Sequence, residues 1–87
     1  MAEIPEYKPR VITTAWLRIV EIGHTGKTWI FDVNSKEGGV NLGQIRWFSY
    51  WRKYSFYPNA NTVYEHQCLR DVALTLEVLM DERKKET

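Results

Sequence analysis

Cysteine is nearly absent from this sequence, since Cys68 is the single one among 87 residues. A lone cysteine excludes an intramolecular disulfide and a metal cluster built on cysteines, and this usage fits a reducing compartment. We expect Cys68 to be a small residue of the core rather than a reactive thiol, which would need an exposed, electropositive environment.

Long apolar runs are also absent, and no stretch approaches the roughly 18–20 residues that a membrane-spanning helix needs. The first ten residues, MAEIPEYKPR, contain acids and prolines and lack the apolar segment of a secretory signal. Pro5 and Pro9 favour a flexible N-terminal arm over residues 1–10. We therefore expect a cytoplasmic protein without a membrane partner.

Recognisable catalytic and metal-binding motifs are missing. His24 and His66 do not have the spacing of paired zinc ligands, and no serine follows the pattern of a nucleophile elbow. Gly38 and Gly39 form a turn rather than a phosphate-binding loop. The carboxylates that could work as a pair already have roles in turns and caps: Asp32, Glu37 and Glu65. We expect a protein that is not an enzyme and has no cofactor and no metal site.

The formal net charge is +1, which is too small for a strongly basic coat on nucleic acid and excludes an acidic mimic of DNA. Any electrostatic attraction must therefore be local. A chain of 87 residues is one domain, with room for a single core of a sheet and a helix.

Four stretches have the β-branched and aromatic composition of strands, and turns containing glycine or polar residues separate them. They are residues 11–22, 27–34, the stretch from Val40 and residues 53–57, which Pro58 ends. Alternation is clearest over 27–34, where one face carries Trp29, Phe31 and Val33. In the first stretch we expect Ala15, Leu17 and Ile19 to face inward, and Trp16, Arg18 and Val20 to face outward. Gly43 indicates a bulge or a close approach of another backbone.

A helix is predicted from Thr62 to about Lys84. Thr62 and Glu65 have the spacing of a capping box, and Arg83, Lys84 and Lys85 suit the negative end of the helix dipole. The apolar residues with the spacing of one helical face are Leu69, Val72, Ala73, Leu76, Leu79 and Met80. The order of elements predicts an α+β domain over residues 11–84, with residues 85–87 as a tail. Its sheet is a four-stranded antiparallel β-meander packed on one face by the C-terminal α-helix (ββββα), and its other face is uncovered.

The segment Leu42–Pro58 contains seven of the twelve aromatic residues of the chain. No acid occurs from Gly38 to Tyr64, a span to which three cations give a charge of +3: Arg46, Arg52 and Lys53. Alternation assigns Ile45, Trp47, Tyr54 and Phe56 to the core. The residues expected to form a binding surface on the open sheet face are Arg18, Arg46, Phe48, Lys53 and Tyr57, with Trp51 and Arg52 at its rim.

Two classes of ligand suit such a surface. Basic side chains neutralise phosphates and aromatic rings stack on exposed bases, which favours nucleic acid. Trp, Tyr and Arg also dominate hot spots between proteins, which favours a protein partner on the same face, as an inhibitor or adaptor. That partner could be a second copy of the chain in a homodimer.

The segments LGQIRW (42–47), WRKY (51–54) and FYP (56–58), followed by CLRD (68–71), resemble a group of small uncharacterised proteins of bacteriophages and mobile elements. The likeness covers about residues 27–79, and its pattern is LGxIxW…WRKYxFxP. The resemblance implies no established activity. It implies a setting, a phage or mobile-element accessory protein, in which small folds bind nucleic acid or block a host defence component such as a CRISPR effector.

Overall fold

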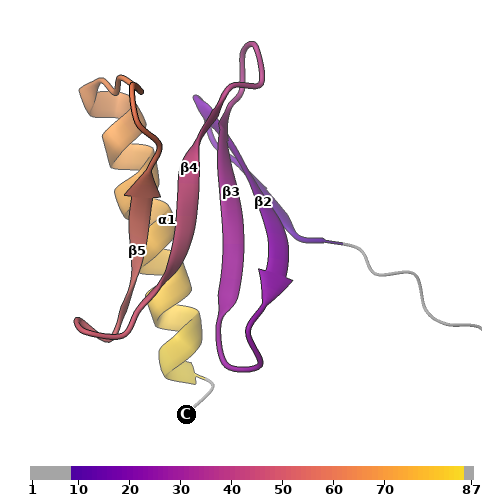
Figure 1. Ribbon diagram of the computed structural model, residues 1–87, viewed down its shortest axis with the longest axis vertical. Helices are drawn as coiled ribbons and strands as arrows, with labels where there is room; N and C mark the ends of the chain where they lie inside the picture. The colour runs from indigo at the N-terminus through magenta and orange to yellow at the C-terminus, as the bar shows by residue number, and fades with distance from the viewer. Residues whose placement is uncertain (1–8, 86–87) are drawn as a thin grey trace, which may run out of the picture.

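The computed structural model of this protein describes residues 9–85. Five strands form one antiparallel sheet in chain order: β1 (Val11–Thr13), β2 (Leu17–His24), β3 (Trp29–Ser35), β4 (Asn41–Phe48) and β5 (Lys53–Pro58). A single helix, α1 (His66–Lys85), then crosses one face of the sheet (Figure 1). The predicted α+β class, with an antiparallel sheet and one C-terminal helix, is confirmed.

The prediction of four strands is wrong, because a tight turn divides the stretch over 11–22 into β1 and β2. The Thr14 hydroxyl accepts hydrogen bonds from the backbone amides of Trp16 and Leu17, and Thr14 N donates to Leu17 O at 2.9 Å. Threonine forms such local bonds in competition with a strand ladder. Trp16 therefore lies in the turn and not on the outer face of a strand.

The arm expected over residues 1–10 falls outside the described residues except for its last two. Of these, Arg10 forms an ion pair with Glu82, with 2.7 Å between Nη1 and Oε1. Its guanidinium carbon lies 5.2 Å from the centroid of the Phe31 ring. The start of β1 is thus tied to the C-terminal half of α1.

The core lies between the sheet and α1. Alternate residues of β2, β3, β4 and β5 point into it, as the period of a strand requires. Its buried members are Leu17, Ile19, Phe31, Val33, Leu42, Ile45, Tyr54, Val72 and Leu79. Trp47 and Phe56 pack against this cluster, which agrees with the sequence assignment of the hairpin aromatics to the core. The Tyr54 hydroxyl accepts a hydrogen bond from Trp29 N at 3.1 Å and so joins β5 to β3.

The helix begins four residues later than predicted. Glu65 itself is the N-cap, because its carboxylate accepts hydrogen bonds from the amides of Gln67 and Cys68. The Thr62 hydroxyl instead lies within hydrogen-bond distance of Asn59 O, at 2.8 Å, and of the Tyr64 hydroxyl, at 2.7 Å, which anchors the linker before the helix. The prediction that Glu65 caps the helix is confirmed, but the prediction that Thr62 is its partner in a capping box is wrong.

The buried stripe of α1 is also displaced from the predicted one. Val72, Thr75 and Leu79 are buried, and Cys68, Leu76 and Met80 pack against the core. Leu69 is 49% exposed and Ala73 is exposed, although both belonged to the predicted face. The helix therefore packs on the sheet through the side that carries Val72, Thr75 and Leu79.

Gly43 fulfils both parts of its prediction. Its φ is 154°. Gly43 pairs with Val33 of β3, and the β3–β4 register shifts directly after that pair, between Val33 and Asn34. A Cβ atom at this position would lie 2.3 Å from the carbonyl oxygen of Tyr57 and 2.9 Å from the Cα atom of Pro58. Only glycine lets β5 approach β4 this closely.

Candidate nucleic-acid interface on the open sheet face

The sheet face opposite α1 is not covered by any element within residues 9–85 (Figure 1). One row of paired residues crosses it from β2 to β5: Val20, Asp32, Gln44 and Tyr57. A second row begins with Arg18, which pairs with Asn34 on β3. The open face is therefore continuous across the sheet. Along the first row it is aliphatic on β2, polar on β3 and β4, and aromatic on β5.

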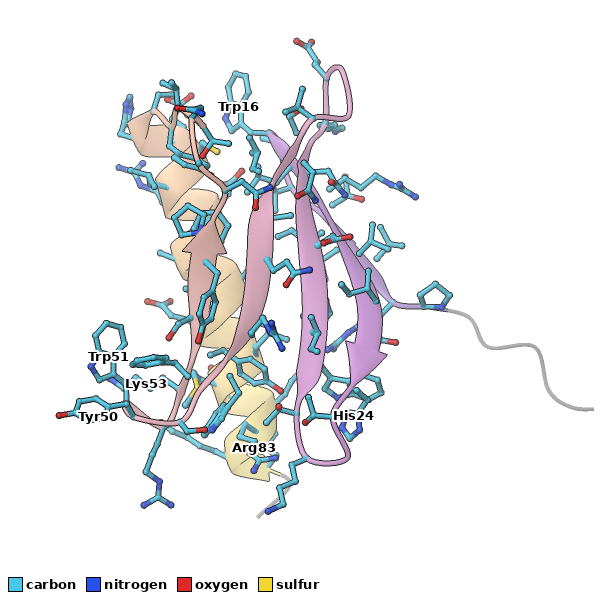
Figure 2. The ribbon with its side chains drawn as sticks, in the orientation of Figure 1. Trp16, His24, Tyr50, Trp51, Lys53 and Arg83 are labelled. Atoms are coloured by element: carbon cyan, nitrogen blue, oxygen red, sulfur yellow. The ribbon has the colours of Figure 1, made fainter. Side chains whose placement is uncertain are left out.

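Six of the seven residues predicted for the binding surface come together on the β4–β5 hairpin. Arg46 and Phe48 extend from β4, Lys53 pairs with Phe48 across the hairpin, and Tyr57 follows on β5. Trp51 and Arg52 lie in the connecting loop. Figure 2 places Trp51 and Lys53 at this end of the molecule, together with Tyr50. We call this group the aromatic-basic surface: Arg46, Phe48, Tyr50, Trp51, Arg52, Lys53 and Tyr57.

Arg18 lies apart from the others, although it shares their face. It sits on β2, and β3 separates that strand from the hairpin. Asp32 of β3 occupies the open face between them, where it accepts a hydrogen bond from Gln44 Nε2 at 3.3 Å. Arg18 is thus outside the acid-free part of the face.

Phe48 is the centre of the aromatic group. Its ring centroid lies 4.8 Å from that of Trp51, 6.2 Å from that of Tyr50 and 6.3 Å from that of Tyr57. The ring planes meet at 55–70°, so the rings contact one another by tilted or edge-to-face packing. Even so, Tyr50 is 86% exposed and Trp51 is 64% exposed.

Tyr50 was not among the residues named for the binding surface, although the turn of residues 50–52 beside them was considered part of the same functional segment. Because the loop joins two strands, strand alternation does not assign its residues to a face. Its position next to Trp51 in a turn between two aromatic strands was the available signal.

The loop over residues 49–52 has a defined backbone. Arg52 N donates to Phe48 O at 2.9 Å and to Ser49 O at 3.2 Å. Arg52 has a φ of 55°, in the left-handed region that glycine and asparagine adopt more readily. When an arginine adopts this conformation, a function of its side chain is a reasonable hypothesis.

Aliphatic side chains occupy the other half of the open face, a feature that the sequence analysis noted only in part. Val11 pairs with Val20, and Ile30 pairs with Gly23 next to Ile22. Val11 is 41% exposed and Ile22 is 46% exposed. We call Val11, Val20, Ile22 and Ile30 the aliphatic patch.

Trp16, expected on the outer face, lies at the opposite end of the molecule from the hairpin tip (Figure 2). It lines a pocket of about 640 Å³ beside the start of α1, together with Leu17, Leu42, Val63 and Cys68. Its 51% exposure makes it an apolar surface residue remote from the aromatic-basic surface. The turn at Thr14 is the reason for this placement.

Cys68 packs against the core, as predicted. Burial raises the pKa of its thiol, and the nearby carboxylates of Glu65 and Asp71 raise it further. A thiol held in its protonated form is a poor nucleophile. Nowhere in residues 9–85 do three His, Cys, Asp or Glu side chains gather as metal ligands, and α1 is not long and apolar enough to cross a membrane.

Comparison with known proteins yields a phage relative. The chain is 34% identical over 76 residues to an uncharacterized 9.3 kDa protein of Acholeplasma phage L2, covering 86% of this chain and 97% of the relative. No family model and no solved structure matches the chain. The phage likeness seen in the sequence is therefore supported, while the relative brings no activity with it.

Proposed function

This chain belongs to the family of the uncharacterized 9.3 kDa protein of Acholeplasma phage L2, and we propose that it is a non-catalytic phage-type protein that binds nucleic acid. The binding site is the aromatic-basic surface. In this proposal the protein works in the cytoplasm, and the segment Leu42–Pro58 is what it shares with similar phage and mobile-element proteins.

The observation that carries the proposal is the meeting of three cations and four exposed or half-exposed rings on one acid-free hairpin. Arg46, Arg52 and Lys53 are all exposed. No acid lies in the sequence from Gly38 to Tyr64. In the described strands, Asp32 is the one acid at an open-face position, and it is paired with Gln44.

Local charge supports nucleic acid although the whole chain is nearly neutral. Residues 66–85 contain four acids and four bases and so have no net charge, whereas residues 38–64 carry +3. Each phosphate neutralised releases counterions, so three contacts would give log K a slope of about −2 against log salt for a single strand. Binding of this kind is weak at physiological salt and is best measured at low salt.

The test is a titration of short oligonucleotides with the double variant Arg46→Glu, Lys53→Glu at low salt. We expect the affinity to fall about ten-fold or more, because two cations become two anions beside the phosphates. The matched control is Lys36→Glu, Arg70→Glu, which makes the same charge change at exposed positions outside the hairpin and should retain far more affinity. Absence of oligonucleotide binding by the unmodified protein at low salt would reject the proposal.

The aliphatic patch favours a second candidate, a protein partner on the same face. Exposed aliphatic side chains on adjacent strands are typical of protein contacts. The partner would be a host protein, such as a component of a defence system, or a second copy of the chain in a homodimer. A measured solution mass separates these: a dimer that Ile22→Lys converts to a monomer supports the homodimer, and a monomeric unmodified protein excludes it.

A further inference from the structure

We infer that the aromatic-basic surface takes nucleic acid whose bases are unpaired, with the rings of Tyr50 and Trp51 stacked on those bases. This inference rests on the proposed function and narrows the ligand to unpaired strands, leaving open whether the sugar is ribose or deoxyribose.

The residues of the loop are unusual for their position. Turns between strands are rich in Gly, Asn, Asp, Ser and Pro because these residues suit the backbone and the solvent. Here Tyr50 and Trp51 occupy the centre of the loop at 86% and 64% exposure, and a left-handed Arg52 follows them. Neither the turn geometry nor the core requires two large rings at this place.

The core already has its own aromatics on the opposite face of the same hairpin. Trp47 and Tyr54 meet edge to face at 5.3 Å, and the guanidinium carbon of Arg83 lies 5.1 Å from the centroid of the Trp47 ring. These contacts join β4 and β5 to the end of α1. The outward rings of Tyr50 and Trp51 are therefore additional to the aromatics that stabilise the hairpin.

Trp51 packs against Phe48 before a ligand arrives, and Tyr50 lies on the same ordered loop. Phe48 contacts both of them, and the hydrogen bonds of Arg52 N to Phe48 O and Ser49 O fix the loop that carries them. Trp51 is inclined by 70° to Phe48, so the two rings are not stacked face to face. A preordered ring loses little conformational entropy on binding, which favours affinity.

The exposed rings distinguish single strands from duplexes. In a duplex each base is stacked on its neighbours and offers only its edge in a groove. Unpaired bases expose their faces and stack on aromatic side chains, while the backbone follows nearby cations. A duplex would use Arg46, Arg52 and Lys53 but would leave the two most exposed rings without a partner.

The experiment compares one labelled pyrimidine strand of about 20 nucleotides, long enough for a typical single-strand site, with the same strand annealed to its complement. The strand is prepared as DNA and as RNA, and binding to the full-length protein is followed by fluorescence anisotropy at low salt. We expect the single strand to bind at least ten-fold more tightly than the duplex. Trp51→Ala should weaken single-strand binding roughly 5- to 150-fold, the range for one base stacked on one ring.

Two matched variants control for folding and for ring chemistry. Trp51→Phe retains a ring and should keep most of the affinity. Trp16→Ala removes another tryptophan that is more than half exposed, at the other end of the molecule, and should change nothing (Figure 2). Duplex binding that equals single-strand binding and survives Trp51→Ala would overturn this inference and leave the proposed function standing. Binding to neither form would overturn both.

Discussion

Arg52 is the residue whose backbone conformation most directly points to a role for its side chain. A non-glycine residue in the left-handed region costs about 1 kcal/mol relative to glycine, and nothing in the described fold uses the Arg52 guanidinium to recover that cost. Asn61 also has a positive φ, but asparagine tolerates it well. The sequence predicts Arg52 at the rim of the binding surface, whereas its left-handed backbone is visible only in the structure.

For Arg52→Gly we expect opposite effects on folding and binding. Relief of strain should leave the free energy of unfolding unchanged or raise it by up to about 1 kcal/mol, since the greater freedom of glycine in the unfolded chain offsets part of the gain. Oligonucleotide affinity should fall, because a phosphate contact is lost. Chemical denaturation and anisotropy measure the two effects. A variant that is both clearly destabilised and unchanged in binding would contradict this account.

At Gly43 the backbone of β5 leaves no room for a side chain. Gly43→Ala should destabilise the protein by about 2 kcal/mol or more, because the new Cβ meets the Tyr57 carbonyl and the backbone there has a positive φ. The melting temperature measures this loss. Gly26→Ala is the control, since it also has a positive φ but no atom within 4 Å of an added Cβ, and it should cost less. Equal losses for the two variants would show that crowding at Gly43 has no effect.

At the scale of elements, the start of α1 depends on one carboxylate. Glu65 was recognised in the sequence as part of a capping motif, but the threonine of that motif bonds to the linker instead. The motif was ambiguous because threonine and glutamate are each competent as caps. The choice between them is made by Tyr64, whose hydroxyl donates to Leu42 O at 2.7 Å and so holds the linker against β4.

Removal of this cap by Glu65→Ala should lower the free energy of unfolding by about 1 kcal/mol, the usual contribution of an N-cap. Thermal unfolding followed by circular dichroism measures the change. Glu65→Gln keeps an oxygen acceptor for the helix amides and should lose less than Glu65→Ala. If Thr62→Ala shortened the helix and Glu65→Ala did not, the assignment of the cap would be wrong.

At the scale of the whole molecule, charge and aromatic surface are distributed unevenly. The aromatic-basic surface and the start of α1 lie at opposite ends, with Trp51 at one and Trp16 at the other (Figure 2). At the hairpin end, Arg83 of α1 donates to Lys27 O in the loop between β2 and β3 at 2.6 Å. This end is therefore braced by α1 while its outward face stays open.

The free energy of unfolding should depend on pH in the alkaline range because of the Cys68 thiol. Because its pKa is raised in the folded state, the unfolded thiol ionises first, near pH ~8.5, and the unfolded chain then binds fewer protons than the folded one. The free energy of unfolding should therefore fall as pH rises through this range. Urea unfolding at several alkaline pH values measures the slope, and Cys68→Ala should reduce it. A slope that is identical in the variant would exclude the thiol as its source.

The sequence by itself determined the order of strands and helix, the hairpin of residues 42–58 and the division of its aromatics into a core set and an outward set. These features follow from local rules, since the segments have the composition of strands and alternate strand residues leave by opposite faces. Tertiary structure decided the break at Thr14 and the buried stripe of α1. It also separated Arg18 from the hairpin by β3 and Asp32, and brought Tyr50 and Trp51 around Phe48. At Thr14 the folded sheet decides between local hydrogen bonds and a continuous strand ladder, and the other features depend on packing and side-chain positions that strand alternation does not encode.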